Sequence, residues 1–289
     1  MKLALGTAQF GLAYGIANTE GQVTADGACK ILSRALEAGM DTIDTAIAYG
    51  ASEERLGEAG VESWRIVSKL PPIPEECMGV HEWVNASVDA SLARLKVPYL
   101  HGLLLHRPRQ LLGINGRQLY QALLQLKDTG KVKKIGISIY EPTELDDICT
   151  QYVIDLVQGP FNVFDRRLVT SGWLNRLHAE GVEIHVRSAF LQGLLLSAKE
   201  KSPAGFERWE QSWTSWRAWT TDVGLNPLRA ALCHVLSYPE ISRVVVGVDS
   251  LNQLNEILAC AEFGLHRAPE TLATADPDLL NPARWSTFL

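Results

Sequence analysis

The chain has 289 residues, of which 46% are hydrophobic and 21% charged, so it is an ordinary globular protein that can bury a large core. Its net charge of −6 argues against nucleic acid or an anionic membrane as partner, because both select basic surfaces. Five widely spaced cysteines without a CxxC pair, a poor signal peptide and no apolar run of the ~18 residues of a membrane span favour reduced thiols in the cytoplasm.

Eight short apolar runs, rich in β-branched residues, recur along the chain and predict eight strands. The runs are LALGT from residue 3, DTIDTA from 41, RIVSKL from 65, GLLLH from 102, KIGIS from 134, DLVQGP from 155, EIHVRS from 183 and RVVVGV from 243. Most are continuously apolar rather than alternating, which is typical of parallel strands that are covered on both faces.

Segments with helical periodicity lie between these runs. The first, residues 24–39, begins at Thr24 as an N-cap and ends at Gly39, a typical C-terminal glycine. The others are residues 82–95, 119–131, 171–181, 225–238 and 250–263. This repeated alternation of strand and helix predicts an α/β fold, a (β/α)8 TIM barrel, as one domain over residues 1–289.

One segment interrupts the alternation between the seventh strand and its helix. Residues 206–219 read FERWEQSWTSWRAW, and their tryptophans are spaced as one helical stripe. The stripe consists of Trp209, Trp213, Trp216 and Trp219. The extra helix either packs on the outside of the barrel or lies at its rim with the indoles facing the mouth. The C-terminal tail, with Trp285 and Phe288, has the same two alternatives.

Ionisable residues end three successive predicted strands. Asp44 ends the second, with Tyr49 in the loop that follows, Lys69 ends the third and His106 ends the fourth. Singly, each is more often structural, but the carboxyl ends of barrel strands meet at one mouth, where barrel enzymes carry their active sites. A lysine ammonium beside a tyrosine favours the phenolate, a carboxylate holds the ammonium, and a neutral imidazole can donate to a carbonyl oxygen. None of the four supplies a hydride, so an external cofactor is required.

With these residues the sequence resembles the aldo-keto reductase superfamily of NAD(P)H-dependent carbonyl reductases on (β/α)8 barrels. The stretches that carry the resemblance are DTIDTAIAYGASEERLGEA, IVSKL, SLARLKVPYLHGLLLH, LLQLKDTGKVKKIGIS, LVQGPFNVFDRR, EIHVRSAFLQGLLL and VVVGVDSLNQLNEI. The resemblance implies that Tyr49 is the proton donor, that Lys69 and Asp44 tune it, and that His106 orients the carbonyl.

The same resemblance implies a set of cofactor-binding residues. Those expected at the nicotinamide carboxamide are Ser138 and Gln158, with Asn162 in the next strand-end loop. Those expected along the pyrophosphate are Arg187, Ser188, Phe190 and Gln192. Those expected at the adenosine end are Gly247, Asp249, Ser250, Gln253 and Glu256. The predicted helix that opens at Ser250 is compatible with this assignment, because helix N-termini attract anions.

Asp249 departs from the family pattern, which usually has an arginine there for the 2′-phosphate of NADP. The resemblance favours NADP(H), whereas a carboxylate at this position suits the ribose hydroxyl of NAD(H). Arg243 and Arg267 are basic residues nearby in sequence. The triplet Ser138-Ile139-Tyr140 resembles a bacterial subgroup often found near polysaccharide genes, which hints at a sugar-derived carbonyl.

We expect a reductase that acts on a small-molecule aldehyde or ketone. The alternatives are a dinucleotide-binding or sensing protein of the same fold with little turnover, and a Schiff-base aldolase that uses Lys69. No metal site is expected, because no strand end offers an HxH pair. The sequence predicts neither the substrate nor the oligomeric state.

Overall fold

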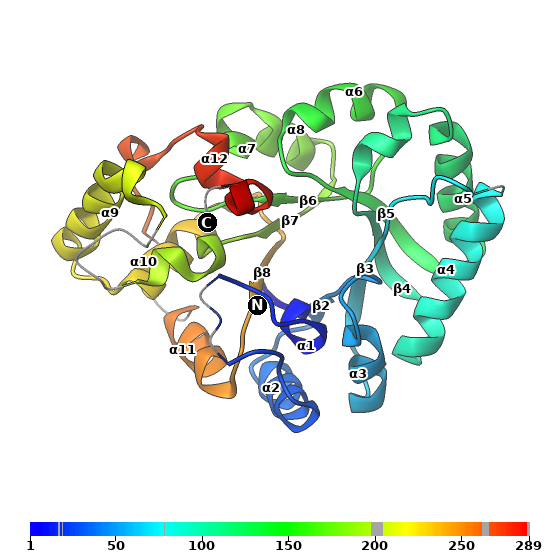
Figure 1. Ribbon diagram of the computed structural model, residues 1–289, viewed down its shortest axis with the longest axis horizontal. Coiled ribbons are helices and arrows are strands. Elements are labelled where there is room, and N and C mark those ends of the chain that lie inside the picture. Colours follow the sequence, from blue (N-terminus) through cyan, green and yellow to red (C-terminus); the bar gives the residue numbers. More distant parts are fainter. Residues whose placement is uncertain (17, 19, 78, 198–204, 262–265, 288–289) are drawn as a thin grey trace.

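The computed structural model describes residues 1–16, 18, 20–77, 79–197, 205–261 and 266–287, and shows eight parallel strands closed into a barrel (Figure 1). The strands are β1 (Leu3–Gly6), β2 (Thr42–Asp44), β3 (Arg65–Leu70), β4 (Leu100–Leu105), β5 (Val132–Ser138), β6 (Leu156–Pro160), β7 (Glu183–Arg187) and β8 (Arg243–Gly247). Each pairs with the next along the chain, and β8 closes the barrel on β1. All eight predicted runs are therefore strands, and the predicted (β/α)8 fold is confirmed.

Helices surround the barrel on its outside (Figure 1). Those that follow the strands are α2 (Ala25–Glu37), α3 (Ser52–Ala59), α4 (Val80–Leu95), α5 (Gly116–Asp128), α6 (Thr143–Gln151), α8 (Trp173–Ala179), α10 (Pro227–Leu236) and α11 (Leu251–Ala261). The shorter α-helical turns are α1 (Ala8–Gly11), α7 (Arg167–Thr170) and α12 (Pro277–Leu280). The 3-10 turns are η1 (Pro108–Leu112), η2 (Leu191–Leu196), η3 (Glu207–Trp209), η4 (Glu270–Leu272) and η5 (Pro282–Thr287).

The six predicted helices are present, with ends that differ by a few residues from the expected ones. Thr24 is the N-cap of α2 as predicted, since its side chain accepts a hydrogen bond from the backbone nitrogen of Gly27. The sequence did not single out α3 and α6. Two hydrophobic clusters hold the layers together: a small one of Val67, Leu104 and Leu156, and a large one between sheet and helices.

The Trp-rich segment forms α9 (Glu210–Asp222) between β7 and α10, as predicted. Trp213 and Trp216 are buried and contact the ring of Phe164 edge-on, at centroid distances of 5.2 and 6.5 Å. The indole nitrogen of Trp216 donates to the backbone oxygen of Leu195. None of the four tryptophans is among the described residues that line the cavity of the site, so these contacts favour the packed alternative over indoles that shape the pocket.

The C-terminal tail packs on the same side of the molecule. The buried indole of Trp285 contacts Phe206 at a centroid distance of 5.1 Å and donates to the backbone oxygen of Leu279. Phe288 lies outside the described residues. Among the helices that the structure describes, none combines the length and the hydropathy that crossing a membrane would require.

Candidate active site

A buried ion pair joins the ends of the second and third strands. The Lys69 ammonium lies 2.6 Å from Asp44 Oδ1 and also donates to the backbone oxygen of Thr45. Burial disfavours the ammonium, but the charges and hydrogen bonds of Asp44 and Tyr49 together outweigh burial and hold the pKa of Lys69 above its usual value. Lys69 is therefore a fixed positive charge, as the sequence led us to expect.

Tyr49 and His106 lie beside this pair. The Lys69 ammonium is 5.1 Å from the centroid of the Tyr49 ring, and the rings of Tyr49 and His106 meet edge-on at 6.1 Å. A tight backbone contact fixes the turn of Tyr49, because a Cβ on Gly11 would lie only 1.6 Å from the Tyr49 carbonyl oxygen. The four residues expected to form the catalytic set thus converge at one point.

His106 is kept neutral at its place in this cluster. Burial, followed by the positive charges of Lys69, Arg187 and Arg107, lowers its pKa from 6.5 to about 4. At neutral pH one ring nitrogen therefore carries a hydrogen and can donate it, while the ring adds no further positive charge to the site.

Gln158, in β6, links the ion pair to the cofactor side of the site. Its side-chain nitrogen donates to Asp44 Oδ2 at 2.6 Å, and since a carboxylate only accepts, this bond fixes the orientation of the amide. Its side-chain oxygen is buried and has no partner among the described residues. Ser138 pairs with Gln158 in the sheet register. Neither Gln158 nor Ser138 is among the described residues that line the cavity of the site, but the unpaired oxygen can accept from an amide, as a nicotinamide carboxamide would require.

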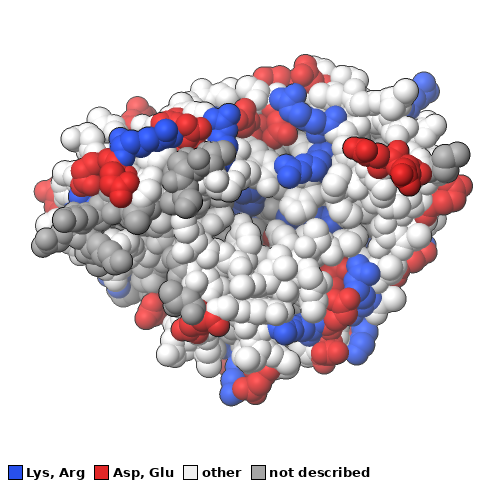
Figure 2. All heavy atoms as spheres, in the orientation of Figure 1, with Lys and Arg blue, Asp and Glu red and all other residues white. Residues whose placement is uncertain are grey.

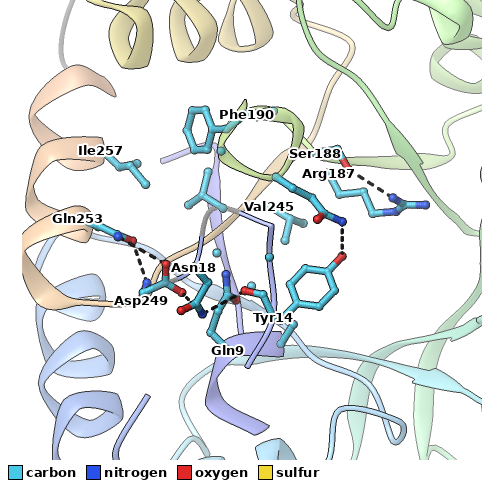
Figure 3. Close-up of a pocket in the computed structure, with 18 of the residues that line it drawn as sticks. Gln9, Tyr14, Asn18, Arg187, Ser188, Phe190, Val245, Asp249, Gln253 and Ile257 are labelled. Atoms are coloured by element: carbon cyan, nitrogen blue, oxygen red, sulfur yellow. Dashed lines mark hydrogen bonds between the residues drawn. The ribbon is translucent and has the colours of Figure 1, made fainter. Parts of the chain in front are cut away.

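A cavity of about 390 Å³ leads from Asp44 and Tyr49 to the end of β8 (Figure 3). This volume falls in the range of small-molecule sites. Eight of the twelve predicted cofactor residues line it: Arg187, Ser188, Phe190, Gln192, Gly247, Asp249, Gln253 and Glu256.

Asn162 and Ser250 contribute in another way. Asn162 donates to the backbone oxygen of Ser188 and accepts from the backbone nitrogens of Phe164 and Asp165, so it braces the loop that carries Ser188. The hydroxyl of Ser250 accepts from the backbone nitrogen of Gln253 at the start of α11. Neither residue lines the cavity, and each holds a neighbour that does.

The far end of the cavity is acidic. Asp249 accepts a hydrogen bond from Asn18. Burial raises its pKa, a hydrogen bond with Gln253 opposes that rise, and the charge of Glu20 adds to it. Arg243 lies at the other end of β8, where it binds Asp41. Arg267 stacks on Tyr238, 4.1 Å from the ring centroid. Neither arginine reaches the cavity, and Arg187 is the one basic side chain among the described residues that line it.

Tyr14, Gly15 and Asn18, which follow α1, line the cavity and were not foreseen from the sequence (Figure 3). The backbone nitrogen of Ile16 donates to the side chain of Gln192, which also donates to the Tyr14 hydroxyl, and Asn18 binds Asp249. The available signal was the long interval between the first strand and the first predicted helix, which contains these polar residues.

Comparison with known proteins identifies the family. The model of the aldo/keto reductase family matches residues 2–269. The chain belongs to the aldo/keto reductase family. Membership supports carbonyl reduction in general as the activity of this barrel.

Two relatives illustrate the match. An uncharacterized oxidoreductase of Bacillus subtilis, YqkF, is 25% identical over 255 residues, which cover 81% of this chain and 82% of that protein. Aflatoxin B1 aldehyde reductase member 2 of mouse is 26% identical over 274 residues, which cover 79% of this chain and 74% of its own.

Solved structures of the family have the same fold. A putative aldo-keto reductase from Pseudomonas aeruginosa superposes with a TM-score of 0.67 at 25% identity, covering 90% of this chain and 89% of the other. The holo form of aldo-keto reductase AKR11C1 from Bacillus halodurans gives a TM-score of 0.74 at 20% identity over 98% of this chain and 95% of its own.

Proposed function

We propose that the protein is an NAD(P)H-dependent reductase that converts an aldehyde or ketone to an alcohol, with Tyr49 as proton donor. The observation that carries the proposal is the convergence of the Lys69–Asp44 pair, Tyr49 and a neutral His106 at one end of the cavity. A carbonyl bound there has a hydroxyl, an imidazole and a fixed cation within reach of its oxygen.

A nicotinamide cofactor suits the rest of the site. Its carboxamide would be held by the unpaired oxygen of Gln158, with Ser138 beside it on the neighbouring strand. When bound in its reduced form, it supplies the hydride that reaches the carbonyl carbon. The hydride brings the electron pair of the new C–H bond, the π electrons of the carbonyl move to its oxygen, and that oxygen takes the proton from the Tyr49 hydroxyl. Lys69 stabilises the phenolate that remains, until solvent returns a proton to it.

The first test replaces the proposed proton donor. Tyr49→Phe removes one oxygen and keeps the ring, so we expect the rate of carbonyl reduction to fall at least about 100-fold, the usual contribution of general acid catalysis. The affinity for the cofactor, measured by quenching of tryptophan fluorescence, should stay within about twofold. Wild-type rates in the variant would show that another group donates the proton.

For the nucleotide we propose NAD(H). The resemblance alone favours NADP(H), but the adenosine end of the cavity carries Asp249 and Glu256 and, among the described lining residues, no basic side chain close to them. A 2′-phosphate there would meet like charges.

We therefore expect NADH to bind at least about tenfold more tightly than NADPH, which corresponds to about 1.4 kcal/mol. Asp249→Asn should narrow this ratio, because it removes one of the two negative charges, whereas Glu240→Gln, outside the cavity, should leave it unchanged. Tighter binding of NADPH by the wild-type protein would refute the assignment.

Neither alternative function gains support from the site. A Schiff-base lysine needs a lowered pKa to attack a carbonyl, whereas Asp44 and Tyr49 together hold the pKa of Lys69 above its usual value despite its burial. A binding or sensing role is distinguished by turnover: cofactor binding without oxidation of NADH across a broad panel of carbonyls would favour it over the reductase.

A further inference from the structure

Two arginines flank one aromatic ring beside the catalytic residues. Arg107 directly follows His106 after β4, and Arg187 ends β7. Their guanidinium carbons lie 5.6 and 4.8 Å from the centroid of the Tyr140 ring, which follows β5. Figure 3 shows the Arg187 side chain directed away from the Asp249 end of the cavity. Three strand ends thus bring two cations together beside Tyr140. Arg187, expected from the sequence along the pyrophosphate, also lines the cavity, so it borders both parts of the site.

Neither guanidinium has a carboxylate partner within the described part of the chain. Arg187 is half-buried, yet its donors reach only neutral oxygens: the backbone oxygen of Ile139 at 3.0 Å and the hydroxyl of Ser188 at 3.4 Å. Two other partly buried arginines bind carboxylates, since Arg243 binds Asp41 and Arg94 binds Glu53. The buried Arg166, in contrast, donates to three backbone oxygens. A guanidinium in the situation of Arg187 has spare donors for an anion.

The nearest acidic residues along the chain are committed to other groups. Glu144 accepts from the backbone nitrogens of Tyr140 and Glu141. Glu141 lies 4.0 Å from Arg167, which Asp165 also binds. These carboxylates therefore satisfy the loop and other arginines, and they leave the charges of Arg107 and Arg187 uncompensated.

The remaining charges at the mouth do not cancel the two arginines. Lys69 and Asp44 neutralise one another, and His106 is neutral at pH 7. The Tyr140 side of the site is thus positive, on a protein of net charge −6, whereas the Asp249 end is acidic. On the face drawn in Figure 2, blue side chains lie in and beside the central hollow, and red ones lie mostly nearer the edge. An anion in the hollow would be attracted by the local field.

We propose that the substrate is a small carbonyl compound that bears a carboxylate or phosphate, and that Arg187 and Arg107 bind this anionic group beside Tyr140. The inference rests on the proposed reductase function and narrows its substrate class. A guanidinium offers two parallel donors that match a carboxylate or a phosphate, and stacking on Tyr140 restricts where they point. The anion would anchor the substrate while its carbonyl lies between Tyr49 and His106.

The test compares matched substrates that differ in charge. Succinic semialdehyde is measured against its neutral methyl ester, and glyceraldehyde phosphate against glyceraldehyde, so that the two pairs separate a carboxylate from a phosphate. We expect kcat/KM for one anionic member to exceed that of its neutral partner at least about tenfold, as one charge-assisted pair of hydrogen bonds provides.

Two variants and a control assign the preference to these arginines. Arg107→Gln and Arg187→Met should each reduce the anionic-to-neutral ratio about tenfold, mainly through KM. The affinity of Arg187→Met for NADH is measured in parallel to separate any effect on the cofactor. Arg109→Gln removes a neighbouring exposed charge that lies near Glu144 rather than Tyr140, and should keep the wild-type ratio.

Calorimetric titration with succinate and with inorganic phosphate measures anion binding without turnover. Binding of either anion that is lost in Arg107→Gln supports the inference. Equal efficiency with charged and neutral substrates would overturn it and leave the reductase function standing. If no carbonyl is reduced, the proposed function fails, and the calorimetry still decides whether the anion site exists: absence of binding would overturn the inference too.

Discussion

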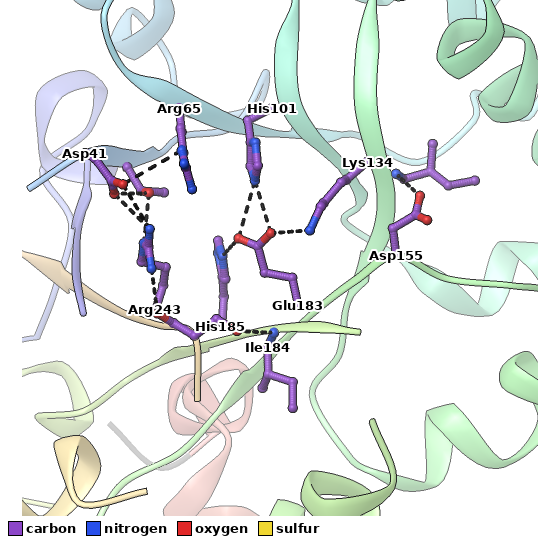
Figure 4. Close-up of polar contacts among 12 residues, drawn as sticks. Asp41, Arg65, His101, Lys134, Asp155, Glu183, Ile184, His185 and Arg243 are labelled. Carbon is purple, nitrogen blue, oxygen red and sulfur yellow. Dashed lines mark hydrogen bonds and ion pairs between the residues drawn. The ribbon is translucent and has the colours of Figure 1, made fainter. Parts of the chain in front are cut away.

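At the carboxyl ends of the strands, Asp44 accepts from Lys69 on one oxygen and from Gln158 on the other, whereas at the opposite end of the barrel Glu183 accepts from a lysine and two histidines (Figure 4). Those three donors are Lys134, His101 and His185, at 2.6, 3.1 and 2.7 Å. Burial opposes ionisation, but the hydrogen bonds from these donors hold the pKa of Glu183 well below its usual range.

The two ends differ in what they leave unpaired. At the end of the barrel opposite the mouth, here called the lower end, Asp41 is likewise bound by Arg243 and Thr42, with Arg65 nearby. One buried imidazole nitrogen of His185 is an exception there, because it has no partner among the described residues. At the mouth, the buried oxygen of Gln158 lacks a partner and Arg187 lacks a carboxylate among the described residues. Similar charged groups therefore stabilise the fold at the lower end, whereas at the mouth some of their donors and acceptors remain available to a ligand.

The largest effect is expected from breaking the ion pair at the mouth. Lys69→Met leaves the Asp44 carboxylate buried without its cation, which should reduce the free energy of unfolding by roughly 3–5 kcal/mol. The rate of carbonyl reduction should fall at least about 100-fold because the phenolate of Tyr49 loses its stabilising charge.

Denaturant unfolding and steady-state kinetics measure the two losses. Lys134→Met is the matched control at the lower end, where it removes one donor to the more exposed Glu183 and should leave kcat nearly unchanged. A Lys69→Met enzyme with more than a tenth of the wild-type rate would contradict the proposed role of the lysine.

An intermediate effect is expected at the lower end. Glu183→Gln removes the charge that binds three donors, so the free energy of unfolding should fall by about 3 kcal/mol while kcat/KM changes less than about twofold. Glu180→Gln, which loses an exposed pair with Arg176, should cost less than about 1 kcal/mol. If Glu183→Gln reduced activity without loss of stability, the two ends would not divide their roles as described.

The effect that is smallest per step, although it accumulates over several pH units, is a dependence of stability on pH. Burial and nearby cations lower the pKa of His106 to about 4 and that of His234 to about 3, against 6.5 in an unfolded chain. Between these values the unfolded state binds more protons, so acidification below pH 6.5 reduces stability, by up to about 1.4 kcal/mol per pH unit for each histidine.

The free energy of unfolding, measured with urea at about pH 5, 6 and 7, tests this slope. His234→Gln should flatten the profile, because one of the two histidines no longer titrates. Nuclear magnetic resonance of the His106 ring should show no titration between about pH 5.5 and 8, and a midpoint near 6.5 would contradict the neutral imidazole at the mouth.

The strands and the convergence of the candidate catalytic residues could be predicted, because both follow simple rules. The apolar runs identified all eight strands, and the rule that strand ends meet brought Asp44, Lys69 and His106 together. The helix α3 was missed because its buried face is polar: Glu53 is 1% exposed and accepts from Ser68, Ser91 and Arg94. Composition alone assigns such a residue to solvent.

Contacts between distant segments account for the rest of the site. The bond from Gln158 to Asp44 spans 114 positions, and that from Asn18 to Asp249 spans 231. The stacking of Arg107 and Arg187 on Tyr140 likewise joins three separate loops. No local pattern encodes such pairs, since they depend on how the barrel closes.

The contact between Gly11 and the Tyr49 carbonyl has a consequence for inherited variation. Every residue other than glycine places a carbon where that oxygen lies, so replacement at position 11 must displace the turn of Tyr49. A genetic screen for lost reduction would therefore recover changes at a residue that has no reactive group. Whether a substitution at position 11 is tolerated therefore depends on the space in the turn of Tyr49 and not on the chemical reactivity of the residue.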